Sequence, residues 1–361
     1  MQYIQTMTAG ILVALLLVLA PPAEAEPYLA ARMGLKCMAC HVNPSGGGKR
    51  NGFGRQFGEV VLPARASTSP RGELFGGRFD IGADFRGDLT ATRIPQGDDQ
   101  LAFDTRRANI YLEAQLVPDR LALYIDQQVA PASDSREAWL LLWNGAHDLY
   151  LKAGRLFLPF GLRLEDDTAF IRSVSGINFA TPDNGVEFGL ERGGWSAQLA
   201  LTNGAGGGAE TNTGKQVSLR AVHVRPRWRL GASININDGD GDTGRRMTGM
   251  FATLNWLGFE WLAEADRIED RGLPAGTIRQ LAMLFEINRQ LLPGQNLRLT
   301  LEHLDPDDEV AEDERVRYSL VWEYTPMASL QLRIGLRLAD GIPQSPSQNT
   351  DSLFVQLHGW F

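Results

Sequence analysis

Polar and apolar side chains alternate along the stretch Arg78-Phe79-Asp80-Ile81-Gly82-Ala83-Asp84-Phe85-Arg86. A period of two indicates a β-strand with one apolar face and one polar face. The same alternation recurs in residues 104–115, 279–288, 296–302, 315–325 and 331–338. The polar face is heavily charged, and the apolar face is rich in Leu, Ile, Phe and Trp. This combination is typical of an outer-membrane barrel, which turns its apolar side chains to lipid and its polar ones to a wet lumen.

Sixteen candidate strands follow one another from residues 76–90, the first, to residues 350–361, the last. Short turns such as residues 117–119 alternate with long loops such as residues 204–214 and 269–275. Bacterial barrels have this arrangement, with short turns at one end and long loops at the other. The predicted fold class is therefore all-β, a transmembrane antiparallel β-barrel of about 16 strands. An even number of strands places both termini in the periplasm.

Two further features match such a barrel. The chain ends on an aromatic residue, Phe361, preceded by alternating apolar residues, which resembles the terminal strand that marks outer-membrane proteins for assembly. The longest connection, residues 158–184, is the third long loop, the one that general porins fold inward to narrow their channel. Its start lies in the stretch GRLFLPFGL, residues 154–162, which resembles the phosphate-selective porins at the equivalent strand.

The only two cysteines lie in one pentapeptide, Cys37-Met38-Ala39-Cys40-His41. This spacing is the attachment signature of c-type haem. Cys37 and Cys40 would form thioether bonds to one porphyrin, and His41 would be the proximal axial ligand of the iron. A Cys37–Cys40 disulfide or half of a zinc site is the alternative. Zinc would need two more His or Cys ligands nearby, and residues 42–146 contain neither. We therefore predict one covalently bound haem c.

The N-terminus predicts export. Residues 11–20 form an apolar run of signal-peptide length, and Ala23-Glu24-Ala25 supplies the small residues of a cleavage site. We predict a signal peptide over residues 1–25 and a location in the bacterial outer membrane. No motif indicates hydrolytic or transferase chemistry, and we expect no nucleic-acid partner for a chain with a formal net charge of −8.

Residues 26–72 form the predicted monohaem c-type cytochrome segment, and residues 73–361 form the barrel. So short a segment cannot enclose a haem with its own core. We therefore expect it to dock in the barrel mouth, where the barrel covers the porphyrin. Lys36 and Arg55 are the candidate partners of the haem propionates, with Lys49 and Arg50 as further cations nearby. Gly46-Gly47-Gly48 matches a phosphate-binding loop too poorly to indicate a nucleotide.

The second axial ligand is left open by the sequence. Parity in the last strand turns His358 into the lumen, whereas the same parity turns His223 and His303 outward. His358 is therefore the candidate distal ligand. Met33, Met38 and an absent or water ligand are the alternatives.

The region around the motif resembles the fused outer-membrane monohaem cytochrome-porins, a family that includes iron-oxidising outer-membrane cytochromes. The resemblance is carried by Ala31-Arg32-Met33-Gly34, the haem motif, Pro44, and the stretch Phe53-Gly54-Arg55-Gln56-Phe57. It implies an electron-transfer protein, with or without a true oxidase activity. Electrons would pass between an extracellular donor or acceptor, Fe(II) among them, and a periplasmic c-type cytochrome.

A second hypothesis is a passive porin or solute channel whose haem is structural or sensory. Under either hypothesis we expect the barrel to contact outer-membrane lipid and to form a homotrimer. The sequence names neither the electron donor nor the direction of electron flow.

Overall fold

The computed structural model describes residues 26–69, 77–179, 181–239, 243–274 and 276–361. The predicted signal peptide, residues 1–25, and the predicted boundary at residues 72 and 73 lie outside these ranges. Within them, no helix is long and apolar enough to span a bilayer.

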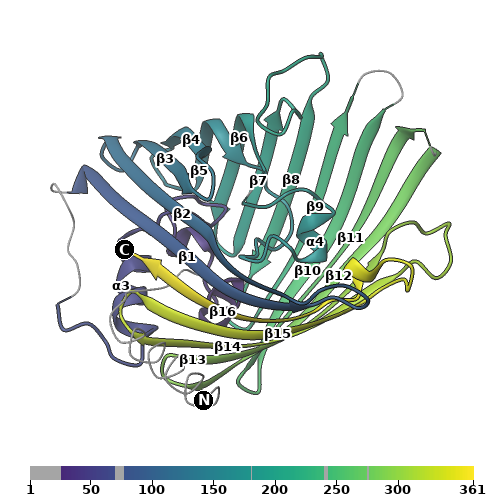
Figure 1. The fold of residues 1–361 in the computed structure, drawn as a ribbon. Helices are drawn as coiled ribbons and strands as arrows, with labels where there is room; N and C mark the ends of the chain where they lie inside the picture. The colour runs from purple at the N-terminus through teal and green to yellow at the C-terminus, as the bar shows by residue number, and fades with distance from the viewer. Residues whose placement is uncertain (1–25, 70–76, 180, 240–242, 275) are drawn as a thin grey trace.

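Sixteen antiparallel strands form one closed barrel, as predicted (Figure 1). Each strand pairs with its neighbours in sequence, and β1 closes the barrel against β16 from Asp84↔Trp360 to Arg93↔Asp351. The strands are β1 (Phe79–Arg93), β2 (Gln100–Val117), β3 (Leu121–Ala130), β4 (Asp134–Trp143), β5 (Leu149–Phe157), β6 (Pro182–Arg192), β7 (Trp195–Thr202), β8 (Gln216–Val224), β9 (Trp228–Asp238), β10 (Gly244–Trp256), β11 (Phe259–Leu273), β12 (Gly276–Leu292), β13 (Gln295–Asp305), β14 (Arg315–Met327), β15 (Leu330–Asp340) and β16 (Asp351–Trp360).

The predicted parity is confirmed along the strands. In β1, Phe79 and Phe85 are 51% and 46% exposed on the outside, whereas Asp84 and Arg86 are buried inside. Large apolar side chains are exposed on every strand in the same way, while the lumen holds most of the buried charged residues. The outside of the barrel is thus apolar and its inside is polar, the reverse of a water-soluble protein.

One predicted loop is wrong. We expected residues 269–275 to form a long loop, but β11 and β12 continue through most of it, with Glu269 paired opposite Arg279. An ion pair between Arg279 Nε and Glu269 Oε2, at 3.4 Å, joins the two strands there. Beyond the lipid-facing part of the barrel, the pairing of β11 with β12 continues through charged residues. The alternation of apolar residues therefore ends before the strands end.

The connection between β5 and β6, residues 158–181, folds into the lumen as predicted and contains a short helix, α4 (Phe170–Ser173). We call it the inward loop. Leu158, Phe160, Leu162 and Ile171 are almost completely buried. Arg172, on α4, forms ion pairs with Glu264 and Asp266 of β11, which tie the loop to the barrel wall.

The N-terminal segment, residues 26–69, also lies inside the barrel (Figure 1). It contains α2 (Pro27–Met33), the 3-10 helix η1 (Cys37–Ala39), α3 (Gly52–Gln56) and the π-helix η2 (Phe57–Val61), and another 3-10 helix, η4 (Pro346–Gln348), precedes β16.

Polar contacts hold the N-terminal segment to strands all around the lumen. The Tyr28 hydroxyl donates to Glu323 of β14 at 2.6 Å, Arg32 pairs with Glu260 of β11 at 2.6 Å, and Lys49 pairs with Glu113 of β2 at 2.8 Å. The segment also reaches the short turns, where Ala64 N–H donates to the Thr325 carbonyl at 2.8 Å. It therefore fills the lumen at the short-turn end.

Candidate functional site

The pentapeptide Cys37–His41 forms a tight turn of helix. The backbone N–H groups of Cys40 and His41 both donate to the Cys37 carbonyl at 3.1 Å. The chain then turns back, and Asn51 closes the turn by donating from Nδ2 to the Met38 carbonyl at 2.9 Å. Cys37 and Cys40 are free thiols, so the structure does not contain the alternative disulfide.

Burial raises the pKa of the Cys40 thiol, although the nearby Arg50 guanidinium acts in the opposite direction. A thiol of this kind is protonated at neutral pH, unlike the thiolate of a catalytic cysteine. Zinc is not favoured either, because the described residues contain no group of three or more His, Cys, Asp or Glu that could hold a metal ion. Among the described residues, neither a reactive thiolate at Cys40 nor a metal site is therefore favoured.

Glycines let the rest of the N-terminal segment pack against the motif. A Cβ on Gly54, in α3, would overlap the Cys40 carbonyl oxygen, so only glycine allows this approach. Gly46, Gly47 and Gly48 all have positive φ angles, of 92°, 82° and 62°. A Cβ on Gly46 would lie 3.1 Å from Cys37 Cβ, and one on Gly47 would overlap the Phe179 ring. The triple glycine thus wraps the backbone between the motif and the inward loop.

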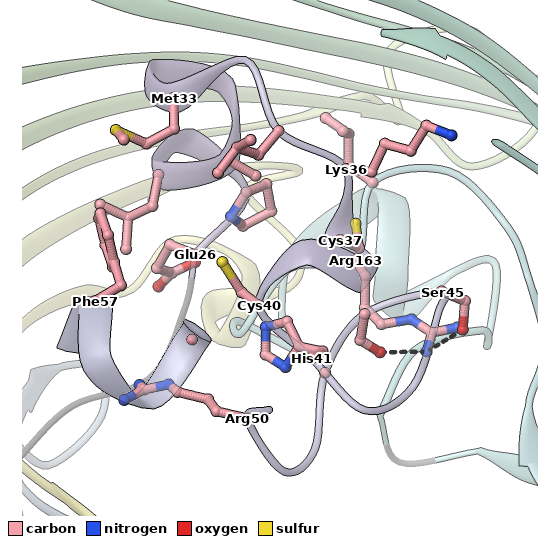
Figure 2. A pocket seen from close by; sticks show the side chains of 18 of the residues that line it. Glu26, Met33, Lys36, Cys37, Cys40, His41, Ser45, Arg50, Phe57 and Arg163 are labelled. Atoms are coloured by element: carbon pink, nitrogen blue, oxygen red, sulfur yellow. Dashed lines mark hydrogen bonds between the residues drawn. The ribbon is translucent and has the colours of Figure 1, made fainter. Parts of the chain in front are cut away.

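Cys37, Cys40 and His41 face a cavity with about 900 Å³ of empty space that is partly open to solvent (Figure 2). We call it the motif cavity. Its walls are mainly apolar and come from the N-terminal segment and from the inward loop, with Leu29, Met33, Leu35, Phe57, Leu162 and Phe179 among them. Two thiols and an imidazole beside apolar walls are the donor set that a c-type haem requires, so the residues present fit this group.

The predicted propionate partners are engaged elsewhere. Lys36 lines the motif cavity, but its Nζ lies 3.1 Å from Glu191 Oε2 and donates to the Trp195 carbonyl at 2.6 Å. Arg55 does not line the cavity, and its Nη1 lies 2.9 Å from Asp80 Oδ2. These cations next to the motif in sequence hold the segment to the barrel.

Three other arginines line the motif cavity, and the sequence analysis did not identify them. They are Arg163 of the inward loop, Arg220 of β8 and Arg229 of β9. The alternation along β8 and β9 turns Arg220 and Arg229 toward the lumen, on either side of a short turn. It did not indicate that both would face the haem motif.

The structure does not bring His358 to the motif cavity. Its side chain points into the lumen, as parity predicted, but it is buried beside Asp84, with Nε2 2.6 Å from Asp84 Oδ2. Met33 does line the cavity, whereas Met38 does not. His223 and His303 lie on the outward face, as expected. His358 as distal ligand therefore remains a prediction, and Met33 is better placed.

A second cavity, with about 1,220 Å³ of empty space, lies along the other part of the inward loop. We call it the loop cavity. Here arginines of the barrel face acidic residues of the loop: Arg86 Nη2 lies 2.8 Å from Glu165 Oε2, and Arg107 Nη2 lies 2.9 Å from Asp167 Oδ2. Arg337 pairs with Asp166. Burial alone would raise the pKa of Asp166, but Arg337 and Arg317 outweigh it and hold this pKa well below its usual range.

The fold is that of the porins. The chain resembles an anion-selective porin from Comamonas acidovorans, with a TM-score of 0.62 at 10% identity over 78% of this chain and 99% of the porin. It also resembles OmpF of Salmonella typhi in complex with daunomycin, with a TM-score of 0.60 at 13% identity over 80% of this chain and 100% of OmpF.

The trimer form of OmpT, an outer membrane protein of Vibrio cholerae, gives a TM-score of 0.57 at 11% identity over 78% of this chain and 99% of OmpT. At such identities the likeness establishes the sixteen-strand barrel and nothing finer. The sequence matches no protein-family model and no curated protein.

Proposed function

We propose that this chain is an outer-membrane barrel that holds one covalently bound haem c in its lumen and carries single electrons across the membrane. The donor or acceptor on one side is extracellular, and the partner on the periplasmic side is a c-type cytochrome. The observation that carries the proposal is the position of the only CxxCH motif. It faces an apolar cavity inside a barrel whose outside is apolar.

The residues of the motif have separate roles in this proposal. Cys37 and Cys40 would hold the porphyrin by thioether bonds, formed as each thiol adds across one vinyl group, and His41 would bind the iron. The N-terminal segment and the inward loop exclude water from the porphyrin faces. When bound, haem supplies one-electron chemistry between ferrous and ferric iron. The donor loses one electron and the acceptor gains it, with no bond made or broken in the protein.

The membrane orientation is part of the proposal. The exposed belt of large apolar side chains fits lipid contact. We place the short turns and both termini at the periplasmic side, so that the N-terminal segment meets the periplasmic partner. Fe(II) as donor rests on the resemblance of residues 31–57 to iron-oxidising cytochromes, and a homotrimer rests on the resemblance of the barrel to trimeric porins.

A haem spectrum tests the first step of this proposal. Membranes that express the chain together with the haem-attachment machinery should give a c-type pyridine-haemochrome spectrum. The haem should stay with the protein through denaturing electrophoresis. Cys37→Ala combined with Cys40→Ala should abolish it and leave a folded, heat-modifiable barrel. A wild-type protein that folds but binds no haem would refute the proposal.

A liposome assay tests the second step. Purified protein is inserted into liposomes that enclose a soluble cytochrome c, and an impermeant reductant is added outside. Reduction of the enclosed cytochrome should require the wild-type motif and be lost in the double alanine variant. No reduction by the haem-loaded protein would rule out the conduit.

The second candidate function is a passive channel with a structural or sensory haem. It is favoured by the likeness to porins and by the loop cavity, where arginines and acidic residues face one another across the lumen. Conductance in planar bilayers distinguishes the two. A channel should conduct ions at the wild-type level with or without haem, whereas a conduit needs no conductance.

A further inference from the structure

Three arginines from separate parts of the chain meet at the wall of the motif cavity. Arg163 comes from the inward loop, and Arg220 and Arg229 come from the lumen faces of β8 and β9. Arg220 and Arg229 are only 7% and 5% exposed. Figure 2 shows Arg163 beside Cys37, with the loop of Ser45 next to its guanidinium. Their positive charges are thus gathered where the cofactor would lie.

Within the described part of the chain, each of these guanidinium groups is hydrogen-bonded only to neutral acceptors. Arg163 donates from Nη1 to the Gly46 carbonyl at 3.1 Å and from Nη2 to the Leu158 carbonyl at 2.9 Å. It has one further, longer bond to the Ser45 hydroxyl, at 3.4 Å. Arg220 donates to the Gly161 carbonyl at 2.8 Å and to the Gln198 side chain at 3.3 Å. Arg229 donates to the Leu35 carbonyl at 2.8 Å, which uses one of its five N–H donors.

No described carboxylate forms an ion pair with any of the three. Among the described residues that line the cavity, Glu26 is the only acid, and its Oε1 lies 3.1 Å from Arg298 and 3.0 Å from Arg333. Its charge is therefore already balanced by arginines outside the trio. Lys36, Lys49 and Arg55 differ in this respect, because all three have carboxylate partners. Arg50 also lines the cavity, and its guanidinium lies 4.0 Å from the centre of the Trp360 ring.

Three buried positive charges without an ion pair to a described carboxylate destabilise the folded protein. Burial lowers the pKa of the Arg163 guanidinium, although Glu137 and Glu187 act in the opposite direction. Arg163 and Arg229 also each experience the positive charge of Arg220. Removing a cation from water without a counter-charge destabilises a folded protein. An anion between these groups would offset the cost of burying their charges and would reduce their mutual repulsion. Carboxylates match the planar guanidinium best.

We propose that Arg163, Arg220 and Arg229 form a binding site for the two propionate carboxylates of the haem. This inference rests on the proposed function for the identity of the ligand. The site replaces the sequence-based assignment of the propionates to Lys36 and Arg55. It also gives the barrel wall and the inward loop a direct part in cofactor binding, so that the short N-terminal segment does not bind the haem alone.

The test uses free porphyrins and the full mature chain with Cys37→Ala and Cys40→Ala, so that covalent attachment plays no part. The protein is titrated with protoporphyrin IX and with its dimethyl ester, and binding is followed by porphyrin fluorescence. The dicarboxylate should bind at least about tenfold more tightly than the ester, since one charge-assisted hydrogen bond is worth about that factor. Adding Arg220→Gln and Arg229→Gln should remove this preference.

The matched control is Arg225→Gln with Arg227→Gln. These two arginines lie in the same short turn, are exposed, and do not line the cavity. The control removes the same charge and should keep the full preference for the dicarboxylate. Equal affinities for acid and ester, failure of both to bind, or a preference that survives Arg220→Gln with Arg229→Gln would each overturn the inference.

The haemochrome spectrum of the wild-type chain tests the proposed function separately. Covalent haem without a carboxylate preference refutes the arginine site alone. A carboxylate preference without covalent haem refutes the proposed function alone.

Discussion

Both cavities along the inward loop are lined with arginines, but only one of them balances the charge within the protein. In the loop cavity, Arg86, Arg107 and Arg337 each face an acidic residue of the loop. In the motif cavity, Arg163, Arg220 and Arg229 are hydrogen-bonded to neutral groups, and none forms an ion pair with a described carboxylate. The first arrangement is complete and holds the loop in place. We assign the proposed haem to the motif cavity because Cys37, Cys40 and His41 line it. The propionates proposed above would balance the charge of its arginines.

We expect the largest effect on haem content from a substitution that pushes α3 away from the Cys37–His41 motif. Gly54→Ala places a methyl group on the Cys40 carbonyl oxygen, whereas the nearby Gly52 has no neighbour within 4 Å of an added Cβ. Overpacking of this kind costs about 1–3 kcal/mol. Gly54→Ala should therefore lower the haem content per folded barrel several-fold, as measured by haemochrome absorbance. Gly52→Ala should leave it unchanged. Equal haem content in the two variants would contradict the observed packing of α3 on the motif.

The sequence predicts the strands and the haem motif, but it does not predict which arginines line the motif cavity. The sixteen strands, the inward loop and the direction of His358 could be predicted, because strand parity is a local property. Cys37, Cys40 and His41 lie within five residues, so the haem motif could also be predicted from the sequence. Arg220 and Arg229 could not be singled out, since lumen-facing arginines also occur at Arg86, Arg107 and Arg333. Which of them faces the motif depends on how residues 26–69 dock, and that depends on contacts with many strands at once.

The next prediction compares two substitutions in the haem-free barrel, one at an arginine that has a carboxylate partner and one at an arginine that forms no ion pair with a described residue. Arg337→Gln leaves the charge of Asp166 less well balanced and should destabilise the inward loop by about 1.5–3 kcal/mol, the range for hydrogen bonds to charged groups. Arg229→Gln gives up one hydrogen bond to Leu35 but relieves the repulsion from Arg220. It should change stability by less than about 1 kcal/mol.

Hydrogen exchange of residues 158–179, together with thermal unfolding of the barrel, measures the difference. The control is Arg227→Gln in the exposed turn, which should alter neither reading. If Arg229→Gln destabilises the protein as much as Arg337→Gln does, the arginines of the motif cavity are structural and the contrast between the cavities is wrong.

Acid should loosen the loop cavity. The pKa of Asp166 is held below its usual range in the folded protein, because Arg337 and Arg317 outweigh the effect of burial. A carboxyl group with a lowered pKa stabilises the fold above its unfolded pKa, about 3.9, and this contribution is lost as the pH falls toward the folded value. Protection of the inward loop should therefore be constant above about pH 5 and decrease below about pH 4. Asp166→Asn should weaken the protection at neutral pH and flatten this part of the profile.

The smallest effect concerns the two candidates for the second axial ligand, of which only Met33 lines the motif cavity. His358 contacts Asp84, Asp84 lies 3.7 Å from Arg86, and Arg86 pairs with Glu165 of the inward loop. His358 is thus linked to the ion pairs of the loop cavity. Met33 lines the motif cavity, and Met with His is the usual axial pair of cytochromes c.

We therefore expect His358→Ala to leave the absorption spectrum of the haem-loaded protein unchanged, because the side chain lies outside the motif cavity. Met33→Ala should alter that spectrum and lower the reduction potential, since a Met ligand raises it. Met33→Leu is the matched control for packing, because it keeps the apolar volume and removes only the sulfur. A change from a low-spin to a high-spin spectrum in His358→Ala would show instead that His358 binds the iron. It would restore His358 as the ligand that strand parity first indicated.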